Sequence, residues 1–111
     1  MLSKSKRLTK AQFDEVWKNG RVSHSPIFVM RIQQNTVDTR CAAVVPQKIG
    51  KKASMRNTDR RKVYMQLHSL LPVTSVNFWA VLVTKKSLKD TKPSDLESDI
   101  KNLFVKSGIL A

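Results

Sequence analysis

The stretch from Lys48 to Lys62, KIGKKASMRNTDRRK, constrains the fold of this chain more than any other. It follows a strand-like run, Cys41 to Val45, and leads into residues with helical periodicity, so Gly50 marks a strand-to-helix junction. Seven of its side chains are cationic and one is acidic. A helix N-terminus already carries about half a positive charge, and cations placed there oppose the helix dipole unless an anion binds. The stretch therefore predicts a polyanion site at the start of a helix.

The helix that follows has two different faces side by side. At a step of about 100° per residue, one face is apolar and predicts contact with a core: Val63, Leu67, Leu70 and Leu71. The neighbouring face is polar and consists of Asn57, Arg61, Tyr64 and His68. Arg60 lies between the two faces. Arginine suits such a face because its planar guanidinium can bind one phosphate through two N–H groups.

Size and charge narrow the class of protein. The chain has 111 residues, which is enough for one domain with one modest core, and its net charge of +13 favours a nucleic acid or an anionic surface as partner. No apolar run approaches the roughly 20 residues of a membrane helix, and the N-terminus lacks the apolar block of a secretory signal, so we expect a cytoplasmic protein with no membrane partner. The single Cys41 predicts a buried thiol rather than a disulfide or a zinc site.

The remaining periodicities predict an α+β sandwich of order α-β-β-β-α-β-α, with helices packed on a small mixed sheet. Thr9 and Gln12 form a capping-box pattern that opens a helix ending at Gly20, and Ser94 with Glu97 forms a second one before a helix ending at Gly108. The predicted strands are Val22–His24, Ile27–Gln33, Arg40–Val45 and Phe78–Val83. Residues 1–8 form a short basic arm, and 9–111 form the single domain.

Several side chains allow two interpretations from pattern alone. Phe13 and Trp17 share a face of the first helix with Val16 and could be core residues or stacking platforms. In the strand Ile27–Gln33, alternation places Phe28, Met30 and Ile32 on one face and Ile27, Val29 and Arg31 on the other. Arg31 therefore matters only if its face of the sheet borders a binding site. A lysine-rich segment between the last strand and helix reads as a solvated loop: Lys85, Lys86, Lys89 and Lys92. The helix acids read as surface or capping groups, which leaves no candidate catalytic residue: Asp14, Glu15, Asp95, Glu97 and Asp99.

The order strand, K-x-G, short linker, then R-N-x-x-[KR]-R on a helix resembles the protein component of bacterial ribonuclease P, and the resemblance extends over nearly the whole chain. The matching residues are Val45, Lys48, Ile49, Gly50, Arg56, Asn57, Arg60 and Arg61. The resemblance implies a left-handed crossover between the third and fourth strands. It also implies 5′-end maturation of precursor tRNA by endonucleolytic cleavage, with the catalytic groups and Mg²⁺ in an RNA subunit and no cofactor bound by the protein alone.

The same resemblance implies roles for individual residues. Those that would bind the catalytic RNA are Lys48, Lys51, Lys52, Arg56, Asn57, Arg60 and Arg61. Those that would line a cleft for the single-stranded 5′ leader of precursor tRNA are Phe13, Trp17, Arg31 and Tyr64. The chain departs from the family pattern at Pro46, Gln47 and Tyr64, where the family has polar or basic side chains.

Two other functions remain open at this stage. A generic basic RNA-binding module of related fold would bind structured RNA without distinguishing precursor from mature tRNA. A DNA-binding helix-turn-helix protein is disfavoured, because the basic helix follows a strand rather than a helix and a tight turn.

Overall fold

The computed structural model describes residues 4–35, 37–74 and 76–110, and in this part of the chain three α-helices accompany four strands. The helices are α1 (Lys10–Asn19), α2 (Ala53–Leu70) and α3 (Pro93–Lys106), with short 3-10 turns at Lys4–Lys6 and Leu71–Val73. The strands are β1 (Arg21–His24), β2 (Phe28–Gln34), β3 (Arg40–Val44) and β4 (Phe78–Thr84). The predicted element order is confirmed, and the first three residues of the basic arm lie outside the described residues.

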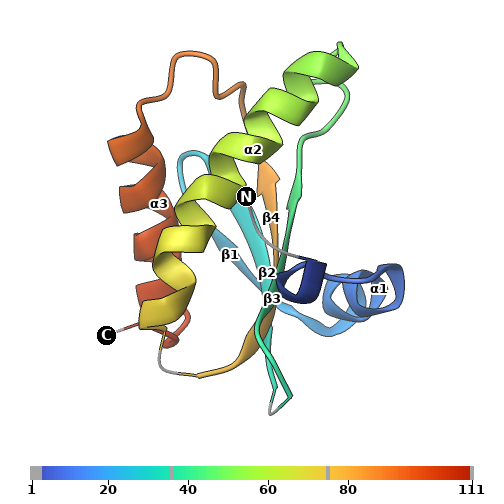
Figure 1. Cartoon of the computed structure of the whole chain (residues 1–111), viewed down its shortest axis with the longest axis vertical. Helices are drawn as coiled ribbons and strands as arrows, with labels where there is room; N and C mark the ends of the chain where they lie inside the picture. The colour runs from blue at the N-terminus through green and yellow to red at the C-terminus, as the bar shows by residue number, and fades with distance from the viewer. Residues whose placement is uncertain (1–3, 36, 75, 111) are drawn as a thin grey trace.

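The four strands form one mixed sheet in the order β1-β2-β4-β3 (Figure 1). The β1–β2 and β2–β4 pairs are antiparallel, and β3 pairs with β4 in parallel, with Ala42 opposite Val81. A parallel pair needs a crossover connection, and α2 provides it. The basic stretch therefore lies on that crossover, where the chain leaves β3 and enters α2.

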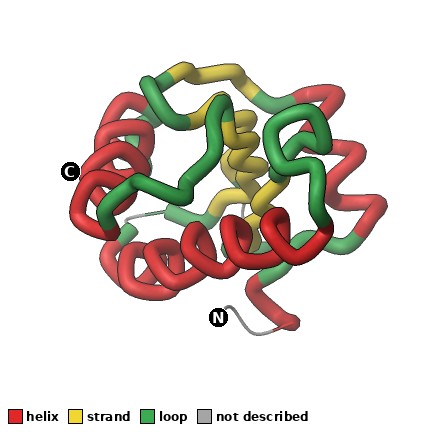
Figure 2. The backbone as a smooth tube through the Cα atoms, turned by 90° about the horizontal axis from the view of Figure 1, so that it is seen from above, coloured by secondary structure: helices red, strands yellow, loops and turns green. Residues whose placement is uncertain are grey.

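The two faces of the sheet are covered differently (Figures 1 and 2). Alternate residues of β2, Phe28, Met30 and Ile32, belong to the main core with apolar side chains of α2 and α3. On the opposite face α1 packs against β2 and β4, where Val16 and Val81 are fully buried outside that main core. Ile27 was expected on the same face as Arg31, but it precedes β2 and lies in the main core.

The starts of α1 and α3 differ from each other. At α1 the predicted capping box is present: the Thr9 amide donates to Gln12 Oε1 (2.8 Å) and the Gln12 amide donates to Thr9 Oγ1 (3.3 Å). The capping box predicted for Ser94 and Glu97 is wrong, because α3 begins one residue earlier at Pro93 with Lys92 as its N-cap and no side-chain cap bond. Proline suits this first position, since its fixed φ is already helical and no amide hydrogen is needed there.

Asp99 also departs from the prediction, because it is buried rather than on the helix surface. The Ser25 hydroxyl donates to the Asp99 carboxylate, and Ser25 Oγ accepts from the Phe28 amide (2.9 Å). Asp99 thus fixes the turn between β1 and β2 to α3.

The segment before α1 is held on the free edge of β3. The Leu8 amide donates to the Cys41 carbonyl oxygen (3.2 Å), and Arg40 Nη1 donates to the Arg7 carbonyl oxygen (3.1 Å). Cys41 is fully buried as predicted, and burial raises the pKa of its thiol to about 12. No helix within the described residues is long and apolar enough to cross a membrane.

Candidate nucleic-acid interface

The loop that leads into α2 is built around Gly50. The amides of Ile49 and Gly50 both donate to the Pro46 carbonyl oxygen (3.0 and 3.1 Å), and Arg56 Nη1 donates to the carbonyl oxygens of Gly50 (2.8 Å) and Lys51 (3.1 Å). A Cβ at position 50 would lie 3.0 Å from Arg56 Cγ, so glycine permits this close approach. Arg56 therefore fixes the loop as well as contributing charge.

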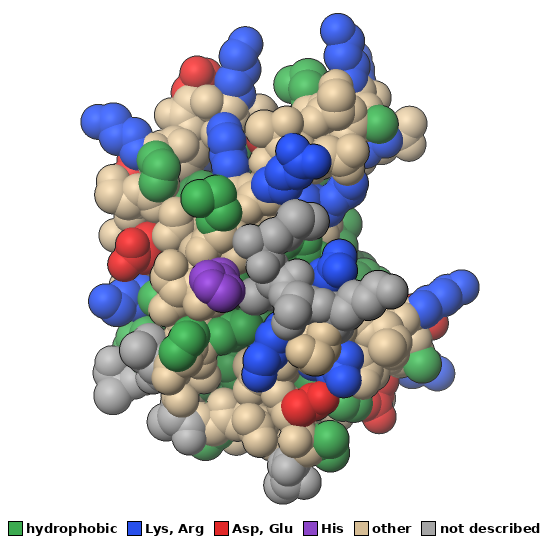
Figure 3. All heavy atoms as spheres, viewed as in Figure 1, with side chains coloured by type: hydrophobic (Ala, Val, Ile, Leu, Met, Phe, Trp, Pro, Cys, Tyr) green, Lys and Arg blue, Asp and Glu red, His purple; other side chains and the backbone are tan. Residues whose placement is uncertain are grey.

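The first turn of α2 is strongly electropositive. Its N-cap, Lys52, makes no side-chain cap bond, and the turn contains no acidic residue. Lys48, Lys51 and Lys52 are all exposed beside it. In Figure 3 lysine and arginine side chains gather at the upper end of the molecule, where α2 begins. Unpaired helix amides and three ammonium groups at one place favour an anion there.

The polar face predicted for α2 is present, with one exception. Asn57, Arg61 and His68 are exposed, whereas Arg60 is half-buried and its Nη2 donates to Asn57 Oδ1. Tyr64 was expected on this face, but it is buried.

Tyr64 lies against the free edge of β3. Its hydroxyl oxygen accepts a hydrogen bond from the Ala43 amide (3.2 Å), a group that has no strand partner on that side. It also borders a hollow of about 510 Å³ together with Arg7, Leu8 and Thr9. Tyr64 therefore contributes the α2 side chain to a hollow that the segment before α1 also lines.

The other three residues predicted for the leader cleft lie together. The rings of Phe13 and Trp17 stack with centroids 5.8 Å apart and planes 8° apart, and Arg31 Cζ lies 4.3 Å from the Trp17 ring centroid. Arg31 Nη1 also donates to the Trp17 carbonyl oxygen (2.9 Å). Trp17 remains 44% exposed, so it is not a core residue, and Arg31 faces α1 rather than open water.

The sheet beside this aromatic group is only partly covered. Val29, Val44 and Val83 are half-buried, in contrast to the fully buried residues of the opposite face. In Figure 3 the surface is hollowed on the right, between the start of α2 and α1. These valines form the row of the sheet next to Arg31, on the side toward the end of β3, so they separate the aromatic group from the start of the basic loop.

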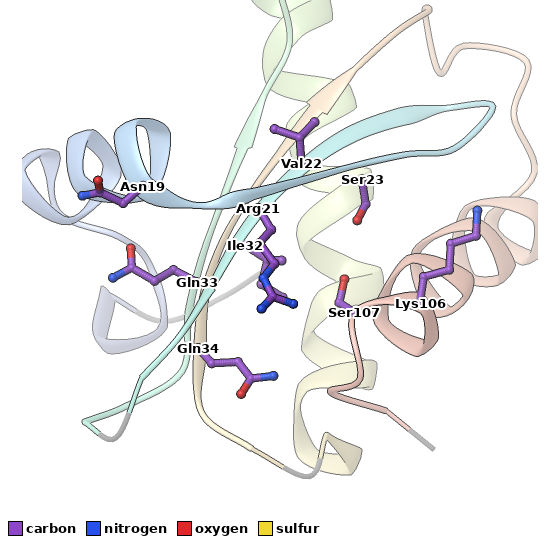
Figure 4. A pocket seen from close by; sticks show the side chains of 9 residues that line it. All are labelled: Asn19, Arg21, Val22, Ser23, Ile32, Gln33, Gln34, Lys106 and Ser107. Atoms are coloured by element: carbon purple, nitrogen blue, oxygen red, sulfur yellow. The ribbon is translucent and has the colours of Figure 1, made fainter.

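A separate hollow of about 340 Å³ lies between β1, the end of β2 and the C-terminal end of α3 (Figure 4). Arg21 and Lys106 contribute cations there, and none of the predicted site residues lines it. Within the described residues, no three His, Cys, Asp or Glu side chains are grouped as metal ligands.

One anchoring feature was missed by the sequence analysis. Asp59 counted there as the single acid of a basic stretch, and Lys62 as one of its seven cations. In the structure Asp59 is buried and both side chains bind the backbone of Leu88, in the segment that joins β4 to α3. An available signal was the position of Asp59, four residues before Val63 on the apolar face.

Fold and charge together define a class: small, strongly basic α+β sandwiches whose parallel β3–α2–β4 crossover begins in a cationic loop. A family model described as Ribonuclease P matches residues 2–108, and the chain belongs to this family. The ribonuclease P protein component of Desulfosudis oleivorans is 32% identical over 105 residues, which cover 91% of this chain and 84% of that protein.

Solved structures agree with the assignment. The RNase P protein from Thermotoga maritima superimposes with a TM-score of 0.78 at 25% identity, covering 90% of this chain and 96% of that one. The Staphylococcus aureus RNase P protein gives a TM-score of 0.81 at 18% identity, covering 97% and 100%. The latter likeness concerns the fold alone.

Proposed function

We propose that this chain is the protein subunit of ribonuclease P, which binds the catalytic RNA and the 5′ leader of precursor tRNA and so promotes 5′-end maturation. The observation that supports this most directly is the placement of two chemistries on either side of one partly covered stretch of the sheet, formed by Val29, Val44 and Val83. The cationic loop and helix lie on one border, where β3 ends, and the stacked Phe13 and Trp17 lie with Arg31 on the other.

The cationic border suits the phosphate backbone of a folded RNA. Its exposed lysines act as point charges, and Arg61 offers a planar fork, so binding releases counterions and weakens as salt rises. Arg56 has a second task, because one of its nitrogens already fixes Gly50 and Lys51. The residues proposed to bind the RNA subunit are Lys48, Lys51, Lys52, Arg56, Asn57, Arg60 and Arg61.

The aromatic border suits unpaired bases. Base–aromatic stacking contributes about 1–3 kcal/mol per base and tolerates any sequence. Arg31 lies over Trp17, so a base would meet a cation as well as the edge of the aromatic stack. The proposal retains Phe13, Trp17 and Arg31 as leader contacts and gives Tyr64 a structural role, as the side chain that joins α2 to the edge of β3.

The proposal assigns Mg²⁺ to the RNA subunit. Apart from Asn57, the residues proposed as RNA contacts carry ammonium, guanidinium or aromatic groups, whereas Mg²⁺ prefers carboxylate and carbonyl oxygens. The protein would instead lower the Mg²⁺ that the RNA needs, because its own cations screen the repulsion between phosphates.

Reconstitution with a bacterial ribonuclease P RNA tests the assignment. At low Mg²⁺ the protein should stimulate cleavage of precursor tRNA, and the complex should bind precursor more tightly than mature tRNA. A generic RNA-binding module would bind the RNA yet give neither stimulation nor preference, and that result would reject the proposal.

Trp17→Ala isolates the leader contact. We expect it to reduce the preference for precursor over mature tRNA by about fivefold or more, since 1 kcal/mol of stacking corresponds to that ratio. Val105→Ala, which truncates a similarly exposed apolar side chain on α3, is the matched control and should leave the preference unchanged.

A further inference from the structure

The segment that joins β4 to α3 is more ordered than its composition suggests. It contains four lysines, and such a segment is usually solvated and mobile. Here Leu88, at its centre, is fully buried and belongs to the main core. The segment therefore packs down onto the domain in its middle as well as at its ends.

Two side chains of α2 bind Leu88 through its backbone. The Leu88 amide donates to Asp59 Oδ2 (3.3 Å), and Lys62 Nζ donates to the Leu88 carbonyl oxygen (3.1 Å). Asp59 is only 5% exposed, so its carboxylate is committed to this contact rather than to water. Lys85 is fixed as well, because its amide donates to the Ile27 carbonyl oxygen (2.7 Å).

This anchoring holds the backbone that carries three exposed lysine side chains. We call Lys85, Lys86 and Lys89 the lysine wall. All three are exposed, and the amides of Lys85 and Lys89 are bonded, to the Ile27 carbonyl oxygen and to Ser87 Oγ. Lys89 also borders a hollow of about 300 Å³ whose other side is formed by Ser54, Met55 and Thr58 of α2. Figure 3 shows cationic groups over this upper end of the molecule.

We propose that the lysine wall is a second contact for the phosphate backbone of the RNA subunit, held in place by Asp59. The inference rests on the RNA binding proposed above and extends it to a segment outside the K-x-G and R-N motif. Anchoring matters because ordering a free lysine-rich loop on binding costs conformational entropy, and a bonded backbone has lost that freedom already.

The RNA subunit, rather than the tRNA leader, is the partner that the position favours. The lysine wall flanks the first turns of α2, next to the cations assigned to that RNA. The aromatic group lies on α1, across the sheet from α3. One RNA surface laid over the start of α2 would meet both sets of cations.

Charge removal is the first test. Lys86→Gln with Lys89→Gln should weaken binding of the RNA subunit alone by about fivefold or more and lower the salt dependence by about 1.5 in log–log slope. The matched control, Lys101→Gln with Lys106→Gln on α3, removes the same charge from exposed positions and should change the affinity much less. Equal losses in the two variants would overturn the proposal, and so would a loss confined to precursor tRNA.

Asp59→Ala is the sharper test, because charge and anchoring predict opposite results. The substitution raises the net charge from +13 to +14, so bulk attraction alone predicts tighter RNA binding. Loss of the Asp59 anchor predicts weaker binding, by about threefold or more, together with faster hydrogen exchange at the Leu88 amide. Tighter binding would overturn the proposal.

Two further variants are needed to interpret the result for Asp59→Ala. If Asp59→Ala does not fold by circular dichroism, Lys62→Gln removes the other Leu88 contact and is compared with Lys101→Gln, which loses the same charge. A larger loss of affinity in Lys62→Gln supports the anchor, and equal losses reject it. Arg61→Ala reports on the proposed function itself: if it too leaves RNA affinity unchanged, the RNA-binding assignment fails along with the lysine wall.

Discussion

At the scale of the single residue, Arg56 and Arg61 belong to the same motif but make different contacts. Arg61 is exposed on α2, whereas Arg56 is half-buried and bonded to the loop at Gly50 and Lys51. We expect Arg61→Ala to weaken RNA binding and lower the log–log salt slope by roughly 0.7–0.9 without a measurable loss of stability. Arg56→Ala should cost about 1–2 kcal/mol in the free energy of unfolding as well, because two backbone carbonyls lose a charged donor.

Urea unfolding and RNA titrations at several salt concentrations, run on both variants, separate these effects. Lys101→Ala, at an exposed position of α3, is the control that shows how much affinity the loss of one charge removes. Unfolding of Arg61→Ala would show that the exposed face of α2 had been assigned incorrectly.

Asp38 gives the molecule a pH-dependent contact. The Trp79 indole and the Arg40 guanidinium both donate to its carboxylate (2.8 and 2.7 Å) and hold the pKa of Asp38 below its ordinary value. A lowered pKa in the folded state means that the stabilisation is present at neutral pH and is lost as pH falls through that pKa. The pair is partly exposed, so its contribution is small, about 0.2–1 kcal/mol.

The variant Asp38→Asn measures this contribution. It should be less stable than the native chain at pH 7 by about that amount, and the difference should shrink as pH falls through the lowered pKa of Asp38. Urea unfolding followed by tryptophan fluorescence reports both values. A difference that stays constant from pH 7 to pH 2 would mean that packing, not charge, distinguishes the two chains.

At the scale of the element, features that depend on residues close in sequence could be predicted from the sequence pattern. Thr9 and Gln12 are three residues apart and complete their capping box within one turn, so the start of α1 could be predicted from sequence. Alternation along β2 likewise predicted that Phe28, Met30 and Ile32 would face the core together. The bounds shifted by a residue or so where a neighbour competed, as Pro93 did with Ser94.

Contacts between distant segments could not be predicted in the same way. Tyr64 is polar at its tip and lies next to the polar face of α2, and only the free edge of β3, 21 residues away, explains its burial. Asp59 is drawn into the core by the Leu88 amide, 29 residues further along the chain. The same division holds at the candidate site. The position of the cationic residues at the start of α2 and of Phe13 and Trp17 on α1 could be predicted from pattern, whereas the contacts of Asp59 and Tyr64 could not.

The two α-helix starts provide a matched pair of variants. Thr9→Ala removes an observed cap and should lower the free energy of unfolding by about 1 kcal/mol. Ser94→Ala removes a side chain that pattern alone would make a cap but that lies inside α3, so the change should stay within about 0.5 kcal/mol. Chemical denaturation measures both, and equal losses would contradict the assigned start of α3.

At the scale of the whole molecule, the net charge of +13 serves binding and opposes folding. Like charges crowded onto a compact domain repel one another, and salt screens that repulsion as well as the attraction to RNA. We therefore expect opposite responses to sodium chloride between about 50 and 500 mM: the unfolding temperature of the free protein rises, while its RNA affinity falls.

A single exposed substitution shows whether repulsion is the cause. Lys10→Glu lowers the net charge to +11 and places an acid in the first turn of α1, which contains none. Both effects stabilise the free protein, by about 0.3–1 kcal/mol at low salt, and both fade as salt rises. Scanning calorimetry of the two chains across the salt series should therefore give melting curves that converge at high salt. Parallel curves, or a native chain indifferent to salt, would show that self-repulsion contributes little and that the cations are tolerated without cost in the unbound state.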